Sequence, residues 1–154
     1  MPSIHTKCFQ KIDYTESSLF HFPCGLPGFE QERAFLFLSW PDSNPLLYMQ
    51  SSQTAELCFV LMPVFVVAPH YRLVLDEDSL AELHLPAIGP PKIGEDILCA
   101  AIVCVTGNQD PPTVNLLAPI VVNLRDRIGI QFIQTDSDYS HQHPLVRKEE
   151  LTCS

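Results

Sequence analysis

The chain has 154 residues, a length typical of one domain with its own apolar core. Its 18 Asp and Glu residues outnumber 9 Lys and Arg residues, which gives a net charge of −9. This excess of carboxylates argues against nucleic acid and anionic membranes as partners, because both are bound through Lys and Arg, and it favours basic partners. The 14 prolines predict short elements joined by stiff turns.

Short apolar runs separated by turn residues dominate the chain. Because these runs are short and rich in β-branched and aromatic residues, they predict strands rather than helices. Several strands at this spacing indicate a mainly β fold, either a sandwich or a barrel. The expected strands span residues 34–40, 46–51, 57–62, 97–105, 119–124 and 128–134.

One segment, residues 76–83, predicts a short helix of about two turns. Asp76 suits the N-cap position, because its carboxylate can accept a hydrogen bond from a free backbone N–H group. Glu77 and Asp78 suit the positive end of the helix dipole. These acidic residues and Glu82 allow two interpretations, a solvated helix or a docking patch for a basic partner.

The six cysteines are expected to be reduced. Residues 1–7 lack the basic and apolar regions of a signal peptide, so we expect a cytoplasmic protein without disulfides. Cys99 and Cys104 lie five apart, on opposite faces of the expected strand, which favours packing over metal ligation. The apolar runs 57–68 and 97–105 are shorter than the roughly 20 residues of a membrane-spanning helix.

Motifs of common catalytic sites are absent from the sequence, which has no G-x-S-x-G, P-loop or G-x-G-x-x-G pattern. Residues 25–28 (Gly-Leu-Pro-Gly) predict two tight turns instead, since Pro27 has no N–H group to offer a phosphate. We therefore expect no enzyme and no cofactor. Two alternatives stay open, a thiol-dependent hydrolase that uses Cys24 near His21 and a small-molecule-binding β-barrel with a deep apolar cavity.

The end of the chain holds residue types that could ligate a metal ion. His141 and His143 lie two apart, and in a strand such residues point to the same face. Asp136 and Asp138 precede them, but a third ligand would have to come from elsewhere. We favour a solvated polar loop and predict no metal.

Three segments, taken in order, carry a resemblance to a known family. They are residues 22–30 (FPCGLPGFE), 113–123 (TVNLLAPIVVN) and 136–145 (DSDYSHQHPL), with weaker matches at 49–51 and 58–60. Together they resemble the signatures of the flagellar assembly factor FliW family over residues 3–146. The chain departs from the family where Cys24 replaces a common Glu and His70 replaces an acidic residue.

The resemblance implies a compact antiparallel β-barrel-like domain over residues 1–146, with one or two short helices, and a flexible tail at 147–154. It implies a chaperone-like protein that binds newly made flagellin in the cytoplasm. Members of this family also antagonise the basic translational repressor CsrA by protein–protein binding, and thereby regulate flagellin translation. We expect no direct contact with nucleic acid or membrane, and a monomer.

Candidate site residues fall into two groups. Those expected to bind partners are acidic or aromatic, with burial in the core as the alternative for each aromatic: Asp76, Glu77, Asp78, Glu82, Phe29, Trp40, Tyr48 and Tyr71. Those expected to shape the backbone belong to the family signatures: Gly25, Pro27, Gly28, Asn115, Pro119 and Asn123. We expect Asn115 and Asn123 to hold a turn about Pro119 by bonding backbone groups.

Overall fold

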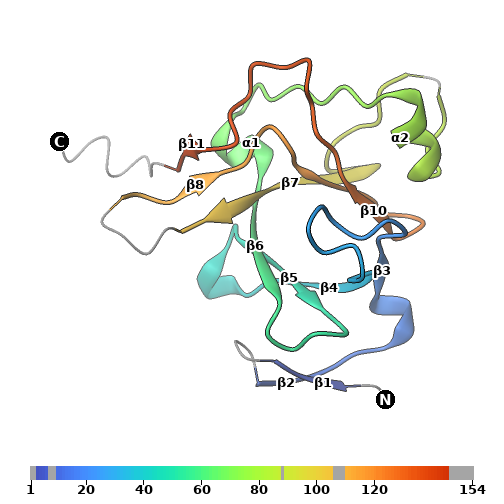
Figure 1. Cartoon of the computed structure of the whole chain (residues 1–154), viewed down its shortest axis with the longest axis vertical. Coiled ribbons are helices and arrows are strands. Elements are labelled where there is room, and N and C mark those ends of the chain that lie inside the picture. The colour runs from blue at the N-terminus through green and yellow to red at the C-terminus, as the bar shows by residue number, and fades with distance from the viewer. Residues whose placement is uncertain (1–2, 7–9, 88, 106–109, 146–154) are drawn as a thin grey trace.

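The computed structural model describes residues 3–6, 10–87, 89–105 and 110–145. A closed β-barrel forms most of this part of the chain (Figure 1). Its strands are β3 (Phe20–His21), β4 (Ala34–Leu38), β5 (Leu47–Ser51), β6 (Cys58–Pro63), β7 (Ile97–Cys104), β9 (Ile120–Asn123) and β10 (Ile128–Gln131). They follow one another around the barrel in the order β7-β6-β5-β4-β3-β10-β9, and β9 pairs back onto β7. All of these pairs are antiparallel except β3 with β10.

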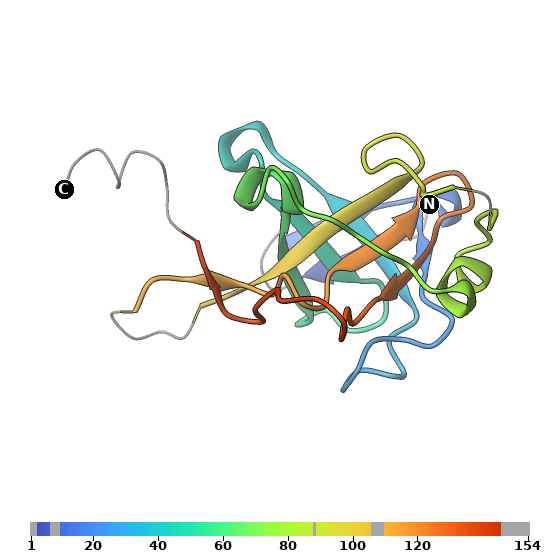
Figure 2. The same ribbon diagram turned by 90° about the horizontal axis from the view of Figure 1, so that it is seen from above.

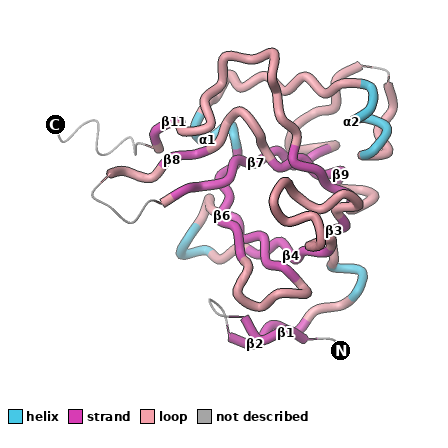
Figure 3. Tube along the Cα trace, viewed as in Figure 1, coloured by secondary structure: helices cyan, strands magenta, loops and turns pink. Residues whose placement is uncertain are grey.

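This barrel confirms the predicted mainly β fold and all six expected strands, with small shifts at their ends. The apolar pattern of the sequence does not predict five short strands, which are β1 (Ser3–Thr6), β2 (Gln10–Asp13), β3, β8 (Thr113–Val114) and β11 (His143–Pro144). β1 and β2 form a separate hairpin, while β8 and β11 extend the far end of β7 (Figure 3). Residues 147–154, the expected tail, lie outside the described residues.

Helical segments are short. They are η1 (Glu16–Ser18), η2 (Pro41–Ser43), α1 (Val64–Val67) and α2 (Glu77–Glu82). α2 is the helix expected from the sequence, whereas α1 was not predicted. Within the described residues, no helix is long and apolar enough to cross a membrane.

Two apolar cores lie on opposite faces of β7. Its residues Leu98, Ala100 and Ile102 point into the barrel, where they join a cluster that includes the fully buried Phe22 and Phe35. The alternate residues of β7 contribute to a second core outside the barrel wall. Burial on both faces explains why the sequence of β7 is apolar without alternation. The apolar side chains of this cluster occupy the barrel interior, which is where the small-molecule-binding alternative would need its cavity.

The second core is covered by the chain that runs from α1 to α2 over the barrel wall (Figure 2). Tyr71 fixes this covering segment. Its hydroxyl donates a hydrogen bond to the Leu116 carbonyl oxygen at 2.6 Å and accepts one from Gln134 Nε2 at 2.7 Å. The Gln134 side chain also accepts a hydrogen bond from the Val74 N–H at 2.9 Å. Burial is the main reason that the pKa of Tyr71 lies well above its ordinary value.

Candidate protein-binding surface

Helix α2 presents the acidic residues that the sequence singled out. Asp76 is its N-cap, as predicted, and accepts a hydrogen bond from the Ser79 N–H at 2.8 Å. Hydrogen bonds from the Ser79 side chain and backbone lower the pKa of Asp76, because they stabilise its ionised form. Glu77, Asp78 and Glu82 are exposed. The capped helix therefore holds three carboxylates at the surface.

The cap predicts a pH-dependent contribution to stability. Asp76→Ala is expected to lower the free energy of unfolding by about 1 kcal/mol at neutral pH, because one N–H group loses its partner. The folded state lowers the pKa of Asp76, so its carboxylate stabilises the fold above the unfolded pKa of about 3.9. That stabilisation is lost as the pH falls through the folded pKa.

Urea unfolding of the Asp76→Ala variant and the parent, at neutral pH and near pH 3, measures this effect. The difference between the two proteins should shrink at the lower pH. Glu77→Ala is the matched control, since Glu77 is an exposed neighbour that does not cap the helix. A difference that stays constant with pH would contradict the role assigned to the Asp76 carboxylate.

The FPCGLPGFE segment forms the two tight turns expected from the sequence. The Gly25 N–H donates to the Phe22 carbonyl at 2.8 Å, and the Phe29 N–H donates to the Leu26 carbonyl at 2.7 Å. Gly25 and Gly28 have positive φ angles of 66° and 85°. The exposed Pro27, between Leu26 and Gly28, suits the first central position of its turn.

A groove of about 290 Å³ separates this double turn from α2. Leu26, Ile130 and Phe132 give it an apolar lining, and the first two of these are buried. Glu30 stands on the side of the turn and Glu82 on the side of the helix. None of the described residues that line the groove is Lys or Arg. The arrangement is an apolar slot between two carboxylates.

Only some of the site residues predicted from the sequence line the groove. Gly25, Pro27 and Glu82 line it, whereas Glu77 and Asp78 do not. The apolar pattern around Ile130 and Phe132 indicates only a buried strand, so the sequence does not predict them as site residues.

The candidate aromatic residues differ in exposure. Phe29 is 41% exposed and packs edge-on against Phe59, with ring centroids 5.4 Å apart. Trp40, 39% exposed, makes a similar contact with the half-buried Tyr48 at 5.4 Å. Tyr71 is only 5% exposed, so the expectation of an exposed ring there is wrong and the core alternative holds. Its ring stacks on Tyr139 and its hydroxyl is satisfied inside the second core.

The two signature asparagines bond backbone groups, but they hold different turns. Asn115 Oδ1 accepts a hydrogen bond from the Ala118 N–H at 3.0 Å, which closes the turn before Pro119 as expected. Asn123 does not hold the turn about Pro119, so that expectation is wrong. Its Nδ2 donates to the Leu83 carbonyl at 2.7 Å, and its Oδ1 accepts from the Arg125 N–H at 3.0 Å. Asn123 thus ties the end of α2 to the turn between β9 and β10.

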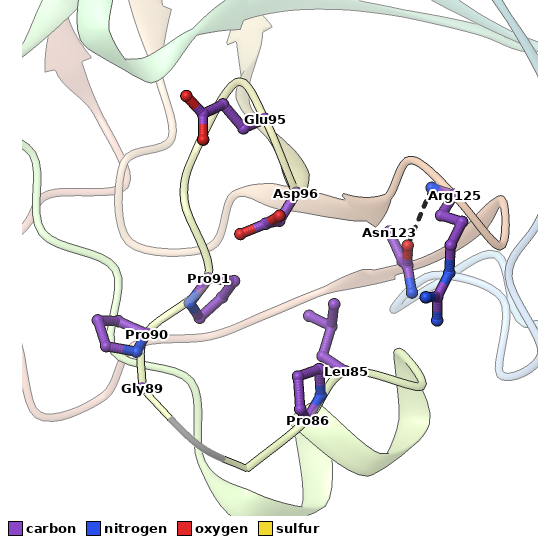
Figure 4. Close-up of a pocket in the computed structure, with 9 residues that line it drawn as sticks. All are labelled: Leu85, Pro86, Gly89, Pro90, Pro91, Glu95, Asp96, Asn123 and Arg125. Carbon is purple, nitrogen blue, oxygen red and sulfur yellow. Dashed lines mark hydrogen bonds between the residues drawn. The ribbon is translucent and has the colours of Figure 1, made fainter.

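A second hollow, of about 280 Å³, lies beside Asn123 and the proline-rich loop that follows α2 (Figure 4). Charges of both signs line it. Asp96 accepts a hydrogen bond from the Lys92 N–H at 2.9 Å, and Arg125 Nε binds Asp126 at 3.0 Å. Asp96 and Arg125 therefore already have partners within the loops, and these contacts stabilise the loops. The hollow does not present a surface of one charge.

Reactive side chains are scattered in the described part of the chain. Cys24, Cys99 and Cys104 are free thiols there. Cys99 is buried, as its expected packing requires, and burial raises its pKa to about 12. Cys104 is exposed, so the expectation that it packs is wrong. Between described residues, no hydrogen bond joins the exposed Cys24 thiol to an imidazole. His, Cys, Asp and Glu side chains likewise form no group of three suited to a metal ion among the described residues.

Comparisons with known proteins agree on one family. The model of the FliW protein family matches residues 3–145. A flagellar assembly factor FliW of Desulfitobacterium hafniense (strain Y51) is 37% identical, and the match covers 97% of this chain and 94% of that protein. The flagellar assembly factor FliW of Bacillus subtilis (strain 168) is 30% identical over 92% of this chain and 95% of its own length.

A solved structure extends this agreement to the fold. The crystal structure of the flagellar assembly factor FliW superimposes with a TM-score of 0.83 and 32% identity, covering 96% of this chain and 99% of that one. The proteins that match are named as assembly factors rather than enzymes. By sequence over nearly its whole length, and by its barrel, the chain belongs to the FliW protein family.

Proposed function

We propose that this chain acts in the cytoplasm as a flagellar assembly factor that binds flagellin and antagonises the translational repressor CsrA by protein–protein contact. Abundant flagellin occupies the protein, and export of flagellin frees it to bind CsrA. Flagellin translation then follows the supply of exported subunits. Family membership supports this role, and the relatives' name supports protein partners in flagellar assembly.

The observation that carries the CsrA part of the proposal is the exposed acidic surface of α2. CsrA is basic and binds RNA, so an acidic protein is attracted to it. Binding a chain of net charge −9 also places negative potential near the RNA, which weakens the salt-dependent contacts between phosphates and Lys or Arg. Antagonism therefore needs no overlap between the two binding surfaces.

The proposal is tested with three purified components, CsrA, flagellin and a flagellin-message RNA. Adding the chain should weaken the binding of CsrA to the RNA, and adding flagellin should restore it. Fluorescence anisotropy of labelled RNA measures both steps. A chain that binds neither flagellin nor CsrA at micromolar concentration would refute the proposal.

The acidic surface predicts an effect on association rate. Glu77→Lys with Asp78→Lys is expected to slow association with CsrA by about threefold to tenfold at low salt, and by less at high salt, because steering is screened. Asp76 is left intact, since it caps the helix.

Stopped-flow or surface-binding kinetics at two salt concentrations measure this rate. The control variant, Glu16→Lys with Glu56→Lys, changes the net charge equally at exposed positions outside α2. Equal association rates for the two variants would show that only total charge matters, and would remove α2 as a steering element.

A further inference from the structure

We propose that the groove between the FPCGLPGFE double turn and α2 binds a basic amphipathic segment of a partner protein, with one large apolar side chain in the groove and a Lys or Arg beside each carboxylate. This inference rests on the proposed function only for the identity of the partner. The chemistry of the occupant follows from the groove itself.

The size and lining of the groove set the apolar part of the occupant. Its volume of about 290 Å³ suits one or two side chains rather than a whole helix. Leu26 and Ile130 are buried beneath it, and Phe132 adds a half-buried ring. A bulky aliphatic or aromatic side chain would gain apolar contact there, which is how anchor residues contribute most of the affinity at protein interfaces.

The carboxylates on the two sides of the groove determine the polar part of the occupant. One oxygen of Glu30, Oε2, accepts a hydrogen bond from the Gly28 N–H at 2.6 Å, which fixes the carboxylate beside the groove. Glu82 stands opposite on α2, and the chain carries twice as many acidic as basic residues. Arg33 binds the backbone carbonyl of Glu30 rather than its carboxylate. The Glu30 carboxylate is thus left to attract a cation on the occupant.

Close contacts hold both sides of the groove. Gly25 approaches the backbone of Glu30 so closely that an added Cβ would lie 2.6 Å from it. On the other side, Asn123 Nδ2 holds the Leu83 carbonyl, which immediately follows α2. A groove fixed in this way binds without first having to close, which lowers the entropic cost of association.

Cys24 provides a local probe, because its exposed thiol lines the groove. The probe ligands are a synthetic amphipathic peptide with a Leu face and a Lys face, and the same peptide with Glu in place of Lys. The rate of Cys24 alkylation by iodoacetamide is measured in the full chain by peptide mapping. Cys104, exposed at the far end of β7, is the internal control.

The Leu/Lys peptide should slow alkylation of Cys24 at least about threefold while leaving Cys104 unchanged, and the Leu/Glu peptide should protect neither. Glu30→Gln with Glu82→Gln should weaken peptide binding about fivefold, because two exposed charge contacts are lost. Gln at position 30 keeps an oxygen for the Gly28 N–H. Glu16→Gln with Glu56→Gln removes the same charge elsewhere and should bind as the parent does.

Several results would overturn the inference. One is a peptide that binds by anisotropy without protecting Cys24. Others are a peptide that does not bind, or equal losses in the two double variants.

The same assay with flagellin and with CsrA separates the two proposals. If a complex forms while Cys24 is alkylated as fast as in the protein alone, the inference about the groove is refuted and the proposed function stays intact. Failure of both proteins to bind would refute the proposed function, whereas the peptide experiment would still decide the groove.

Discussion

Gly25→Ala is expected to lower the free energy of unfolding by about 2–5 kcal/mol. Gly25 has a φ angle of 66°, where any residue with a Cβ is strained by about 1–2 kcal/mol. Its added Cβ would also lie 2.6 Å from the Cα and carbonyl oxygen of Glu30. These are backbone atoms, so relief requires the turn itself to move, and overpacking of this kind costs about 1–3 kcal/mol.

Gly28 supplies the control for this prediction. It also has a positive φ angle, 85°, but an added Cβ there meets nothing within 4 Å. Gly28→Ala should therefore cost only the backbone strain, about 1–2 kcal/mol. Guanidinium unfolding of both variants measures the difference. Equal losses would show that the close approach of Gly25 to Glu30 does not govern the turn.

The consequence of Gly25→Ala extends to the groove. Gly25 and Glu30 both line it, so a displaced turn changes the position of the Glu30 carboxylate. Gly28→Ala should leave that position nearly unchanged. Peptide binding measured on the two variants, under conditions where both are folded, therefore tests whether the groove depends on this one close contact.

The sequence alone predicts the elements that have strong local patterns. The uninterrupted apolar run of β7 predicted a strand because few other elements accommodate it between turn residues. Asp76 predicted the start of α2 because capping is a local interaction. The double turn at Gly25 and Gly28 was predicted for the same reason, since a positive φ angle is a property of single residues.

Elements set by tertiary contacts were missed. Val64–Val67 has the composition of a strand, yet it forms α1, because Pro63 precedes it and Val64 packs into the second core. β3 and β8 have two residues each and exist only through their pairing partners. A two-residue ladder leaves no periodic pattern in a sequence.

The candidate groove combines segments that are far apart in the sequence. Glu30, Glu82 and Phe132 lie about 50 residues apart from one to the next, and only the barrel topology brings them together. Tyr71 shows the same dependence on distant contacts. It is a single aromatic residue in a segment without a clear pattern, so the sequence leaves both a surface and a core position open. Its burial depends on Leu116 and Gln134, which come from distant parts of the chain.

Gly129→Ala is the second change expected to have a large effect, about 2–3 kcal/mol lower stability. Gly129 lies in β10, and an added Cβ would lie 2.5 Å from Cζ of Phe22. The Phe22 ring is fully buried, packs edge-on against Phe35 at 5.3 Å and stacks on Phe37 at 6.4 Å. It therefore has little space into which it can turn, and the strand must shift instead.

A double-mutant cycle isolates this contact. Phe22→Leu alone should cost about 1–2 kcal/mol, because it leaves a small cavity in the barrel. It also removes the atoms that an alanine at position 129 would overlap, so the two changes together should cost less than their sum by about 1 kcal/mol. Thermal and guanidinium unfolding of the two single variants and the double variant measure the coupling. Strict additivity would mean that the strand absorbs the extra methyl without pressing on the ring, and that the close approach of Gly129 to Phe22 does not limit packing inside the barrel.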